Sequence, residues 1–541
     1  MKVHEAIGRA LADQGAQTIF GVLGDANLFF MDSFVRHGGG RFVSASNEAG
    51  ATLMAIGHAA VSGQVGVATV TLGPGVSNTV SALLEGVRGN VPLVLLAGDT
   101  GDDERDEISR LMQREMITVT GAGFEQVRSP ATVFEDVSMA FWRARVERRP
   151  VALNIRRDFQ WADIDYQRVV RRLPEERALV PNGPDLEEAL GIVASAKRPL
   201  VLAGRGVVAT SAAAAVAKFA RRIEAPLATT MKAKDLFHGD PDNLGVFGTM
   251  SHPGSVDAIL ASDCVIAFGA GLNHYTTSKG VFLRGKRVVQ VNRSSHEIGR
   301  FAQPTVGMVG DPELTAALLT EWLDTAEIPP SGFTRELHAE GRLESATAAQ
   351  ARLFDDNSPV DLAEALCRIN RVFPKNRIVI TDGGRFLSRA WMDIDVFDPR
   401  YFVYTLNYGS IGMGLPEAVG AAMACADRPA LLVTGDGGFM LGGLAEFSTA
   451  VRHGCDLVVV VCNDSSYGAE DVQLTNRGMD PSIARFSWPD FAPVAVALGG
   501  QGVTVRTMGD LQSALDAIEA RQGPLLIDLK LDPDTVPPLG H

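Results

Sequence analysis

Two acidic strand ends carry the clearest chemistry in this sequence. The apolar run ALLVT leads into Gly435-Asp436-Gly437, and the next apolar run, DLVVVV, leads through Cys462 to Asn463-Asp464. One helix-length segment separates the two. Oxygen ligands at neighbouring carboxyl ends of parallel strands suit a hard cation such as Mg²⁺, and flanking glycines let backbone amides approach a phosphate group closely. The segment therefore predicts a metal and diphosphate site.

The elements that must position these acids alternate along the whole chain. Short β-branched runs such as RFVSAS are followed by longer amphipathic segments such as EAGATLMAIGHAAVSG, which predicts parallel sheets with crossover helices. We expect an α/β protein of three doubly wound parallel-sheet domains, at residues 1–165, 186–325 and 359–541. Residues 168–185 and the polar stretch 331–359 are expected to be linkers. The first and third domains have a similar succession of strands and helices and are expected to be related folds.

The expected strands are residues 17–24, 41–46, 65–73, 91–98, 198–209, 263–271, 286–292, 377–384, 430–437, 456–464 and 524–531.

Composition excludes several classes of protein. The chain has 541 residues, 46% of them hydrophobic and 21% charged, as in ordinary globular proteins. No apolar run approaches the roughly 20 residues that span a bilayer, and the N-terminus is unlike a signal peptide, so we expect a soluble, cytoplasmic protein. The formal charge of −14 argues against nucleic-acid or membrane partners. The five cysteines lack CxxC spacing and are expected to be reduced.

The segment GDGGFMLGGLAEFSTAVRHGCDLVVVVCND resembles the GDG…NN signature of thiamine diphosphate enzymes. Its surroundings are similar to the superfamily that includes acetolactate synthase and pyruvate decarboxylase, and the resemblance covers nearly the whole chain. It implies the thiamine diphosphate-binding fold, with a pyrimidine-binding, a middle and a diphosphate-binding domain in that order. The implied cofactors are thiamine diphosphate and Mg²⁺. The alternative is an unrelated α/β protein in which GDGG is only a tight turn.

The resemblance also suggests the metal ligands. Family members have an Asn as second ligand, with a Gly four residues later, and Gly468 puts Asp464 in that position. Asn463 is the alternative ligand, and the carbonyl of Ser466 is a further one. The interval from Asp436 is then one residue longer than in the family, with the extra residue expected in the MLGGL turn. An Asp in place of Asn adds negative charge and should strengthen Mg²⁺ binding.

Glu48 directly follows the strand RFVSAS, where the family has the carboxylate that binds N1′ of the aminopyrimidine. Such a contact promotes the imino tautomer that removes the proton from the thiazolium carbon. The alternative is a helix-terminal Glu that only offsets the macrodipole, but the Gly73-Pro74-Gly75 loop follows at the family distance. In the family, this Glu and the diphosphate site of one active site come from different subunits. We therefore expect a homodimer as the minimum and a homotetramer as the full assembly.

Other cofactor contacts follow from the same resemblance. Ile411 stands where a bulky apolar side chain forces the cofactor into its V shape, and the carbonyl of Gly409 would accept from the 4′-amine. The remaining implied cofactor-binding residues are Gly383, Gly384, Gly435, Asp436, Gly437, Gly438, Asp464, Tyr467 and Gly468.

Three positions bear on the reaction, and they disagree. Asp25 and Glu470 match acids of pyruvate decarboxylase-type enzymes, whereas Gln113 is closer to acetolactate synthases, in which a Gln faces the substrate. Alternatively, Asp25 caps a helix and Glu470 lies on a solvated lid. We expect a 2-oxo acid decarboxylase/carboligase of the acetolactate synthase-like group, which releases an aldehyde or joins the product to a second carbonyl compound.

Two other functions stay open. One is a carbon–carbon lyase acting on a 2-hydroxy ketone, 2-hydroxyacyl-CoA or cyclic diketone, and the other is a non-catalytic homologue. The middle domain carries Asn273-His274 near the position where acetolactate synthases have an Arg that binds FAD. We therefore expect no FAD, and an ADP or acyl-CoA site stays open.

Overall fold

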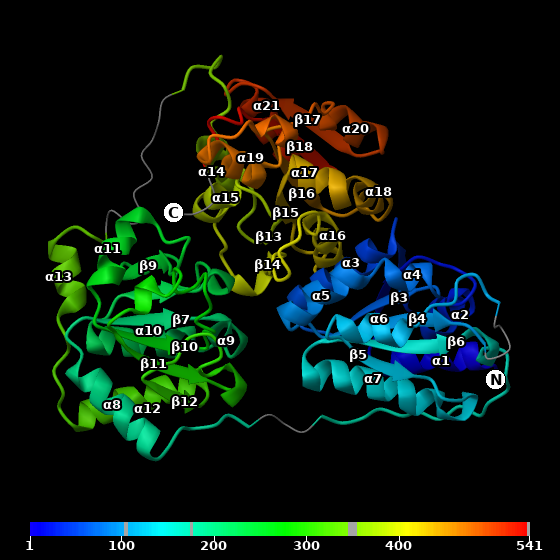
Figure 1. Cartoon of the computed structure of the whole chain (residues 1–541), viewed down its shortest axis with the longest axis horizontal. Helices are drawn as coiled ribbons and strands as arrows, with labels where there is room; N and C mark the ends of the chain where they lie inside the picture. The colour runs from blue at the N-terminus through cyan, green and yellow to red at the C-terminus, as the bar shows by residue number, and fades with distance from the viewer. Residues whose placement is uncertain (102–105, 174–176, 344–353, 538–541) are drawn as a thin grey trace. The chain divides into compact units, whose positions relative to one another are not determined.

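The computed structural model describes residues 1–101, 106–173, 177–343 and 354–537 (Figure 1). These residues form three six-stranded parallel sheets with interleaved helices, as the sequence predicts. The chain divides into two compact units, one holding the first and third sheets and the other holding the middle sheet with residues 395–402.

The first sheet has the strand order β2-β1-β3-β4-β6-β5. Its strands are β1 (Thr18–Gly21), β2 (Arg41–Ser44), β3 (Gly66–Val70), β4 (Leu93–Asp99), β5 (Gly123–Gln126) and β6 (Pro150–Arg156). Its helices are α1 (Val3–Asp13), α2 (Leu28–Gly38), α3 (Glu48–Ser62), α4 (Pro74–Ser77), α5 (Val80–Gly89), α6 (Gln113–Val119) and α7 (Val133–Glu147). Strands β3, β4 and β6 are buried on both faces, which explains their nearly continuous apolar sequences.

The third sheet repeats this topology, since its order is β14-β13-β15-β16-β18-β17. Its strands are β13 (Ile378–Thr381), β14 (Phe402–Tyr404), β15 (Ala430–Gly435), β16 (Leu457–Asn463), β17 (Gln501–Val505) and β18 (Leu525–Lys530). Its helices are α14 (Leu362–Val372), α15 (Leu387–Asp393), α16 (Gly414–Ala424), α17 (Asp436–Gly438), α18 (Leu444–Arg452), α19 (Gly468–Asn476), α20 (Phe491–Ala497) and α21 (Leu511–Ala520). The first and third domains therefore share one sheet topology, which agrees with the similar strand pattern of their sequences.

The middle sheet has the order β12-β11-β10-β7-β8-β9, which is that of a Rossmann-type doubly wound sheet. Its strands are β7 (Pro199–Ala203), β8 (Leu227–Thr229), β9 (Asn243–Val246), β10 (Cys264–Phe268), β11 (Arg287–Asn292) and β12 (Val306–Val309). Its helices are α8 (Pro184–Ser195), α9 (Arg205–Ala209), α10 (Ala213–Ile223), α11 (Pro253–Ala261), α12 (Pro312–Thr325) and α13 (Phe333–Ala339).

Each expected strand has a counterpart in the structure, but residues 205–209 of the expected strand 198–209 form α9, and the expected linker at 331–359 is partly wrong. Its first part forms α13, and its residues 344–353 lie outside the described part of the chain. Phe333 and Leu337, one helical turn apart, are buried in the core of the middle domain. Two apolar residues in a polar stretch were therefore enough to anchor a short helix.

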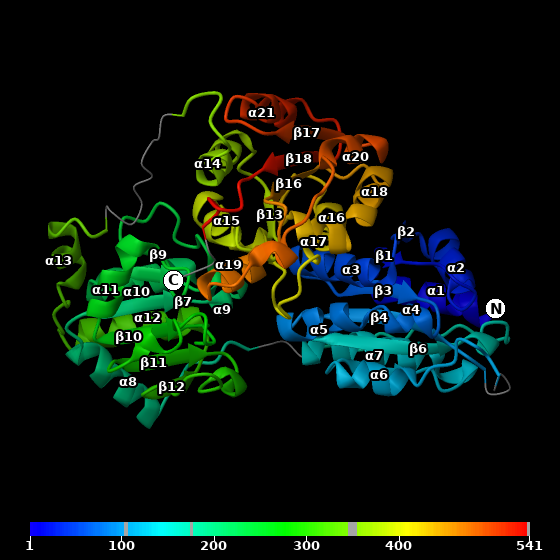
Figure 2. The ribbon, with the colours of Figure 1, turned by 45° about the horizontal axis from the view of Figure 1, so that its top comes forward.

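Helices α3 and α16 join the first and third sheets, and Figures 1 and 2 both show them side by side. Two glycines bring their backbones into contact. A Cβ atom at Gly57 would lie 2.0 Å from the carbonyl oxygen of Glu417, and one at Gly420 would lie 1.8 Å from that of Met54. The crossing therefore depends on a missing side chain in each helix.

Among the described residues, none of the helices combines the length and apolar character that a bilayer crossing requires.

We predict that Gly420→Ala lowers the free energy of unfolding by about 1–3 kcal/mol, because the new methyl group meets backbone that no rotamer change can move. The matched control is Gly191→Ala in α8, where a Cβ atom has nothing within 4 Å. Alanine favours a helix over glycine, so this control should hold or raise the melting temperature. Equal melting temperatures for the two variants would contradict the proposed crossing.

Candidate active site

Asp436 and Asp464 follow two adjacent strands, β15 and β16, which pair in parallel with Gly435 opposite Cys462. Both side chains are buried, with exposed fractions of 2% and 6%. Oδ2 of Asp436 makes no hydrogen bond of normal geometry among the described residues, and the indole N–H of Trp488, which also lacks such a partner, lies near this carboxylate. Burial, together with the charge of Asp464, raises the pKa of Asp436 to about 7. A buried carboxylate oxygen without a donor, next to a second carboxylate, fits a site for a cation.

Asn463 and Asp464 point to different partners. The Asn463 amide donates to Oδ1 of Asp528 at 2.8 Å, and its carbonyl oxygen accepts from the backbone of Ser465 at 3.3 Å. Asp464 instead shares the space beside Asp436, and its Oδ1 accepts from the backbone N–H and the hydroxyl of Ser466. The geometry therefore favours Asp464 over Asn463 as the partner of Asp436.

Glycines around this acid pair bring four chain segments close together. A Cβ atom at Gly437 would lie 2.7 Å from the ring of Tyr467, and one at Gly468 would lie 2.6 Å from the side chain of Arg385. A Cβ atom at Gly383 would lie 3.0 Å from Ile411. The missing side chains thus let these segments pack closely around the acid pair, and glycine backbone of this kind can approach a diphosphate group.

Asp382 holds two of these segments together. The buried carboxylate accepts from the backbone N–H groups of Gly383, Gly412 and Gly414 and from the Thr434 hydroxyl. Burial nevertheless raises its pKa to about 6, because desolvation outweighs these donors. Asp382 was not among the predicted site residues, although an acid at the end of the strand in ITDGG was a signal for it.

The loop that carries Ile411 packs on a π-helical turn at Phe439–Gly443. Gly412 has φ +84°, and a Cβ atom at Gly442 would lie 2.1 Å from the Gly412 carbonyl oxygen. A π-helical turn accommodates one additional residue in a helix. The turn therefore occurs where we expected the extra residue between Asp436 and Asp464.

Glu48 is the first residue of α3, where the Asn47 side chain caps the helix by accepting from the backbone of Gly50. Its Oε2 accepts from the Asn78 amide at 2.9 Å, and its Oε1 lies near Gly75. The structure thus brings Glu48 and the Gly73-Pro74-Gly75 loop together, as expected.

Asp25 and Gln113 lie next to the same loop: Asp25 contacts Thr71, just before the loop, and Gln113 contacts Gly73 within it. Asp25 accepts from the Thr71 hydroxyl and pairs with Arg157. The Gln113 amide is buried, accepting from the Gly73 backbone at 2.7 Å and donating to Gly98 and Asn154. Gln113 therefore holds the Gly73-Pro74-Gly75 loop through the backbone of Gly73. Direct contact of Gln113 with a substrate stays a prediction.

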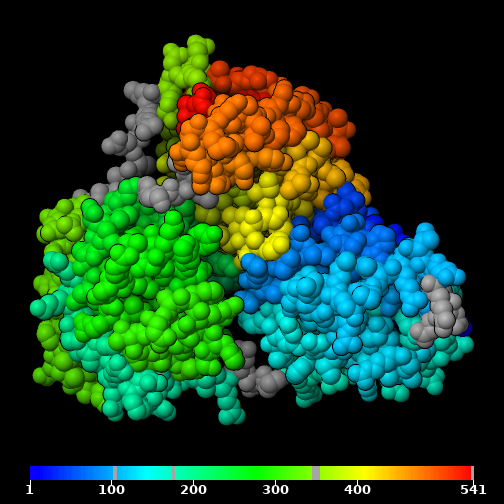
Figure 3. All heavy atoms as spheres, viewed as in Figure 1, coloured from blue at the N-terminus to red at the C-terminus, as the bar shows by residue number. Residues whose placement is uncertain are grey.

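Glu470 and Tyr467 lie at the beginning of α19, and both side chains are exposed. The region around α19 is part of the orange surface in Figure 3. No hydrogen bond or ion pair of the Glu470 side chain occurs among the described residues. The expected role of Glu470 near a substrate thus stays a prediction.

Two buried glutamates hold the predicted cofactor-binding segments across the interface between the first and third sheets. Glu446 of α18 accepts from the backbone N–H groups of Ser46 and Asn47, immediately before Glu48. Glu85 of α5 accepts from the backbone N–H groups of Asn407 and Tyr408, immediately before Gly409. Each domain thus holds the loop of the other. Neither glutamate was predicted, because no local pattern relates it to its distant partner.

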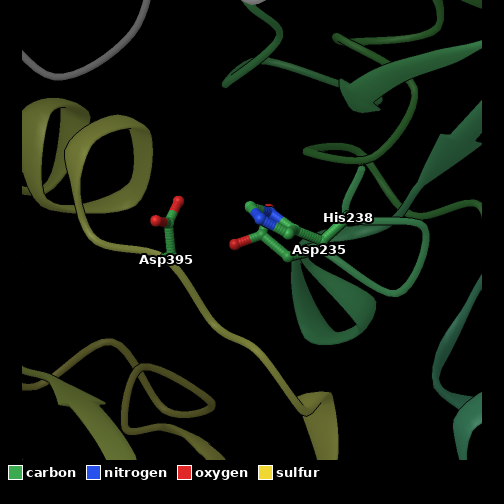
Figure 4. Close-up of side chains that lie close together, drawn as sticks. All are labelled: Asp235, His238 and Asp395. Atoms are coloured by element: carbon green, nitrogen blue, oxygen red, sulfur yellow. The ribbon is translucent and has the colours of Figure 1, made fainter. Parts of the chain in front are cut away.

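A separate group of Asp235, His238 and Asp395 lies in the unit of the middle sheet, and Figure 4 shows the three side chains facing one another. Asp235 already pairs with Lys234 and accepts from the backbone of Val396. We assign no metal to this group, since its best-placed carboxylate has protein partners.

We predict that Glu446→Gln loosens the beginning of α3, because an amide cannot accept from two N–H groups with both of its terminal atoms. Hydrogen exchange at Ser46, Asn47 and Gly50 should become about 10-fold faster or more. The control is Glu519→Gln on the exposed side of α21, which should leave these amides unchanged. Unchanged exchange in Glu446→Gln would contradict the positioning role.

Comparison with known proteins adds independent information. Residues 1–121 match the N-terminal TPP binding domain of thiamine pyrophosphate enzymes, residues 186–319 match the central domain, and residues 382–529 match the C-terminal TPP binding domain. The three matches follow the order of the three sheets.

Several named proteins are similar to this chain over nearly their whole length. The chain is 29% identical to a sulfoacetaldehyde acetyltransferase of Castellaniella defragrans, over 96% of this chain and 91% of the relative. It is 26% identical to a probable acetolactate synthase large subunit of Methanocaldococcus jannaschii, over 100% of this chain and 94% of the relative. An acetolactate synthase large subunit of Haemophilus influenzae is 25% identical, over 98% and 94%. The chain therefore belongs to the thiamine pyrophosphate enzymes, and within them it is acetolactate synthase-like.

Proposed function

We propose that this protein decarboxylates a 2-oxo acid with thiamine diphosphate and Mg²⁺, and then releases an aldehyde or joins the product to a second carbonyl compound. The observation that carries the proposal is the pair Asp436 and Asp464 at adjoining strand ends, with one carboxylate oxygen that lacks a donor. Such a pair suits a cation that in turn holds a diphosphate group.

Asp436 and Asp464 would hold the cation, with the carbonyl of Ser466 as a third ligand. The glycine backbones at 383–384, 435, 437–438 and 468, together with Tyr467, would surround the diphosphate, and Ile411 with the Gly409 carbonyl would orient the rings. When bound, thiamine diphosphate supplies a carbon nucleophile and an electron sink. The protein supplies orientation and the movement of protons.

Glu48 would bind the aminopyrimidine ring nitrogen and hold a proton there, because its second carboxylate oxygen is already fixed by Asn78. In this proposal Glu48 serves the diphosphate site of a second copy of the chain, so a homodimer is the minimum and a homotetramer is compatible with it. Asp25 and Glu470 would exchange protons with the substrate. Arg157 pairs with Asp25 and would keep its carboxylate oriented.

Acetyl transfer is a second candidate, because the relatives in Castellaniella defragrans and Alcaligenes xylosoxydans xylosoxydans are named sulfoacetaldehyde acetyltransferases. This reaction lies outside the carbon–carbon lyase alternative, and it differs from decarboxylation because an aldehyde substrate has no carboxyl group to lose. The exposed, acidic Asp25 and Glu470 do not by themselves distinguish the two candidates.

A substrate panel separates these functions. The protein with thiamine diphosphate and Mg²⁺ is incubated with 2-oxo acids, with 2-hydroxy ketones and with sulfoacetaldehyde, and both CO₂ and organic products are measured. We expect CO₂ from at least one 2-oxo acid. Absence of CO₂ from every 2-oxo acid would overturn the main proposal. Consumption of sulfoacetaldehyde would then favour acetyl transfer, and consumption of a hydroxy ketone would favour the carbon–carbon lyase.

We predict that Glu48→Gln binds thiamine diphosphate but loses at least about 99% of turnover, because the amide cannot take up the proton. Glu519→Gln is again the control for loss of a carboxylate. Near-normal turnover by Glu48→Gln would contradict the role of Glu48, whereas loss of cofactor binding would show that the residue acts on assembly of the site.

A further inference from the structure

Arg385 is the positive charge next to the acid pair. It lies in the loop between β13 and α15, and its side chain is only 4% exposed. Its Nε donates to Oδ2 of Asp464 at 2.6 Å, and its Nη2 lies 2.6 Å from the same oxygen. Because a guanidinium stays charged at any physiological pH, this is a permanent, buried ion pair.

The contacts of Asp464 are divided between its two oxygens. Oδ1 accepts from Ser466, whereas Oδ2 is held by Arg385. Asp436 has no cationic partner among the described residues, and its Oδ2 makes no hydrogen bond of normal geometry there. The protein therefore neutralises one carboxylate of the pair and not the other.

The Arg385 guanidinium also has one N–H donor group without an acceptor among the described residues. Nη2 of Arg385 is buried and makes no hydrogen bond among the described residues, because its contact with Oδ2 is close but poorly aligned. A buried N–H group without an acceptor is costly unless a ligand supplies one. Arginine binds phosphate oxygens through such N–H groups.

Gly468 is adapted to this arginine. A Cβ atom at this position would lie 2.6 Å from both Cδ and Nε of Arg385. The side chain thus passes over the Gly468 backbone at the beginning of α19, next to the glycines that would surround a diphosphate. A larger residue here would displace the guanidinium from Asp464.

From these contacts we infer that Arg385 is a diphosphate-binding residue that also neutralises Asp464, so that the metal site can carry two carboxylates. This inference rests on the proposed function, and it specifies how the site tolerates Asp464. With two carboxylates and an anionic diphosphate around one divalent cation, a fixed positive charge reduces the repulsion. A purely structural ion pair between two loops is the competing explanation.

The test compares Arg385→Gln, Asp464→Asn and the double variant, with Arg389→Gln as control because Arg389 pairs with Asp393 on α15. The first measurement is the melting temperature of chelator-treated protein without cofactor. We expect each single variant to melt several degrees lower and the double variant to recover most of the loss, because neither buried charge is then left alone. Additive losses in the double variant would overturn the neutralising role.

The second measurement is calorimetric binding of Mg²⁺ with inorganic pyrophosphate, which requires no catalysis and no thiamine. We expect Arg385→Gln and the double variant to bind pyrophosphate about 10- to 100-fold more weakly, and Arg389→Gln to bind it normally. Normal binding by Arg385→Gln would leave only a structural ion pair and overturn the inference. If pyrophosphate binding depends on Arg385 but thiamine diphosphate does not bind, the proposed function fails and the inference about Arg385 stands.

Discussion

The close crossing of α3 and α16 is the constraint on which the candidate site depends. Gly57 and Gly420 let the two backbones touch, and this contact joins the first and third sheets into one unit. Glu446 and Glu85 then reach across the interface and hold the segments that precede Glu48 and Gly409. Because the two folds have the same strand order, the arrangement is reciprocal: each domain fixes a functional loop of the other.

Electrostatics explains how the diphosphate domain is organised. Asp382, Asp436 and Asp464 are buried at the ends of three neighbouring strands, and each is stabilised in a different way. Backbone N–H groups solvate Asp382, an arginine neutralises Asp464, and Asp436 keeps an oxygen free. In the proposed site Asp436 and Asp464 hold the cation together, and Asp382 organises the loops beside them.

The sequence was most informative where function depends on local pattern. Strand ends, glycines and the spacing of Asp436 and Asp464 predicted the three sheets and the acid pair, because these features arise within a few residues. Glu85 and Glu446 escaped prediction, since their partners lie 322 and 400 residues away. Gln113 was predicted to face the substrate because of its position in the sequence. Its side-chain orientation, however, is set by hydrogen bonds to Asn154 and Gly73, which only the folded chain brings together.

The most direct test of the account is a calorimetric titration of thiamine diphosphate into protein that has been stripped of metal by a chelator, with and without added Mg²⁺. We predict one cofactor bound per chain when Mg²⁺ is present, and binding at least about 100-fold weaker without it, because no cation would then offset the charge of the diphosphate beside Asp436 and Asp464. Equal affinity with and without Mg²⁺, or no binding in either case, would contradict the assignment of Asp436 and Asp464 as the metal site.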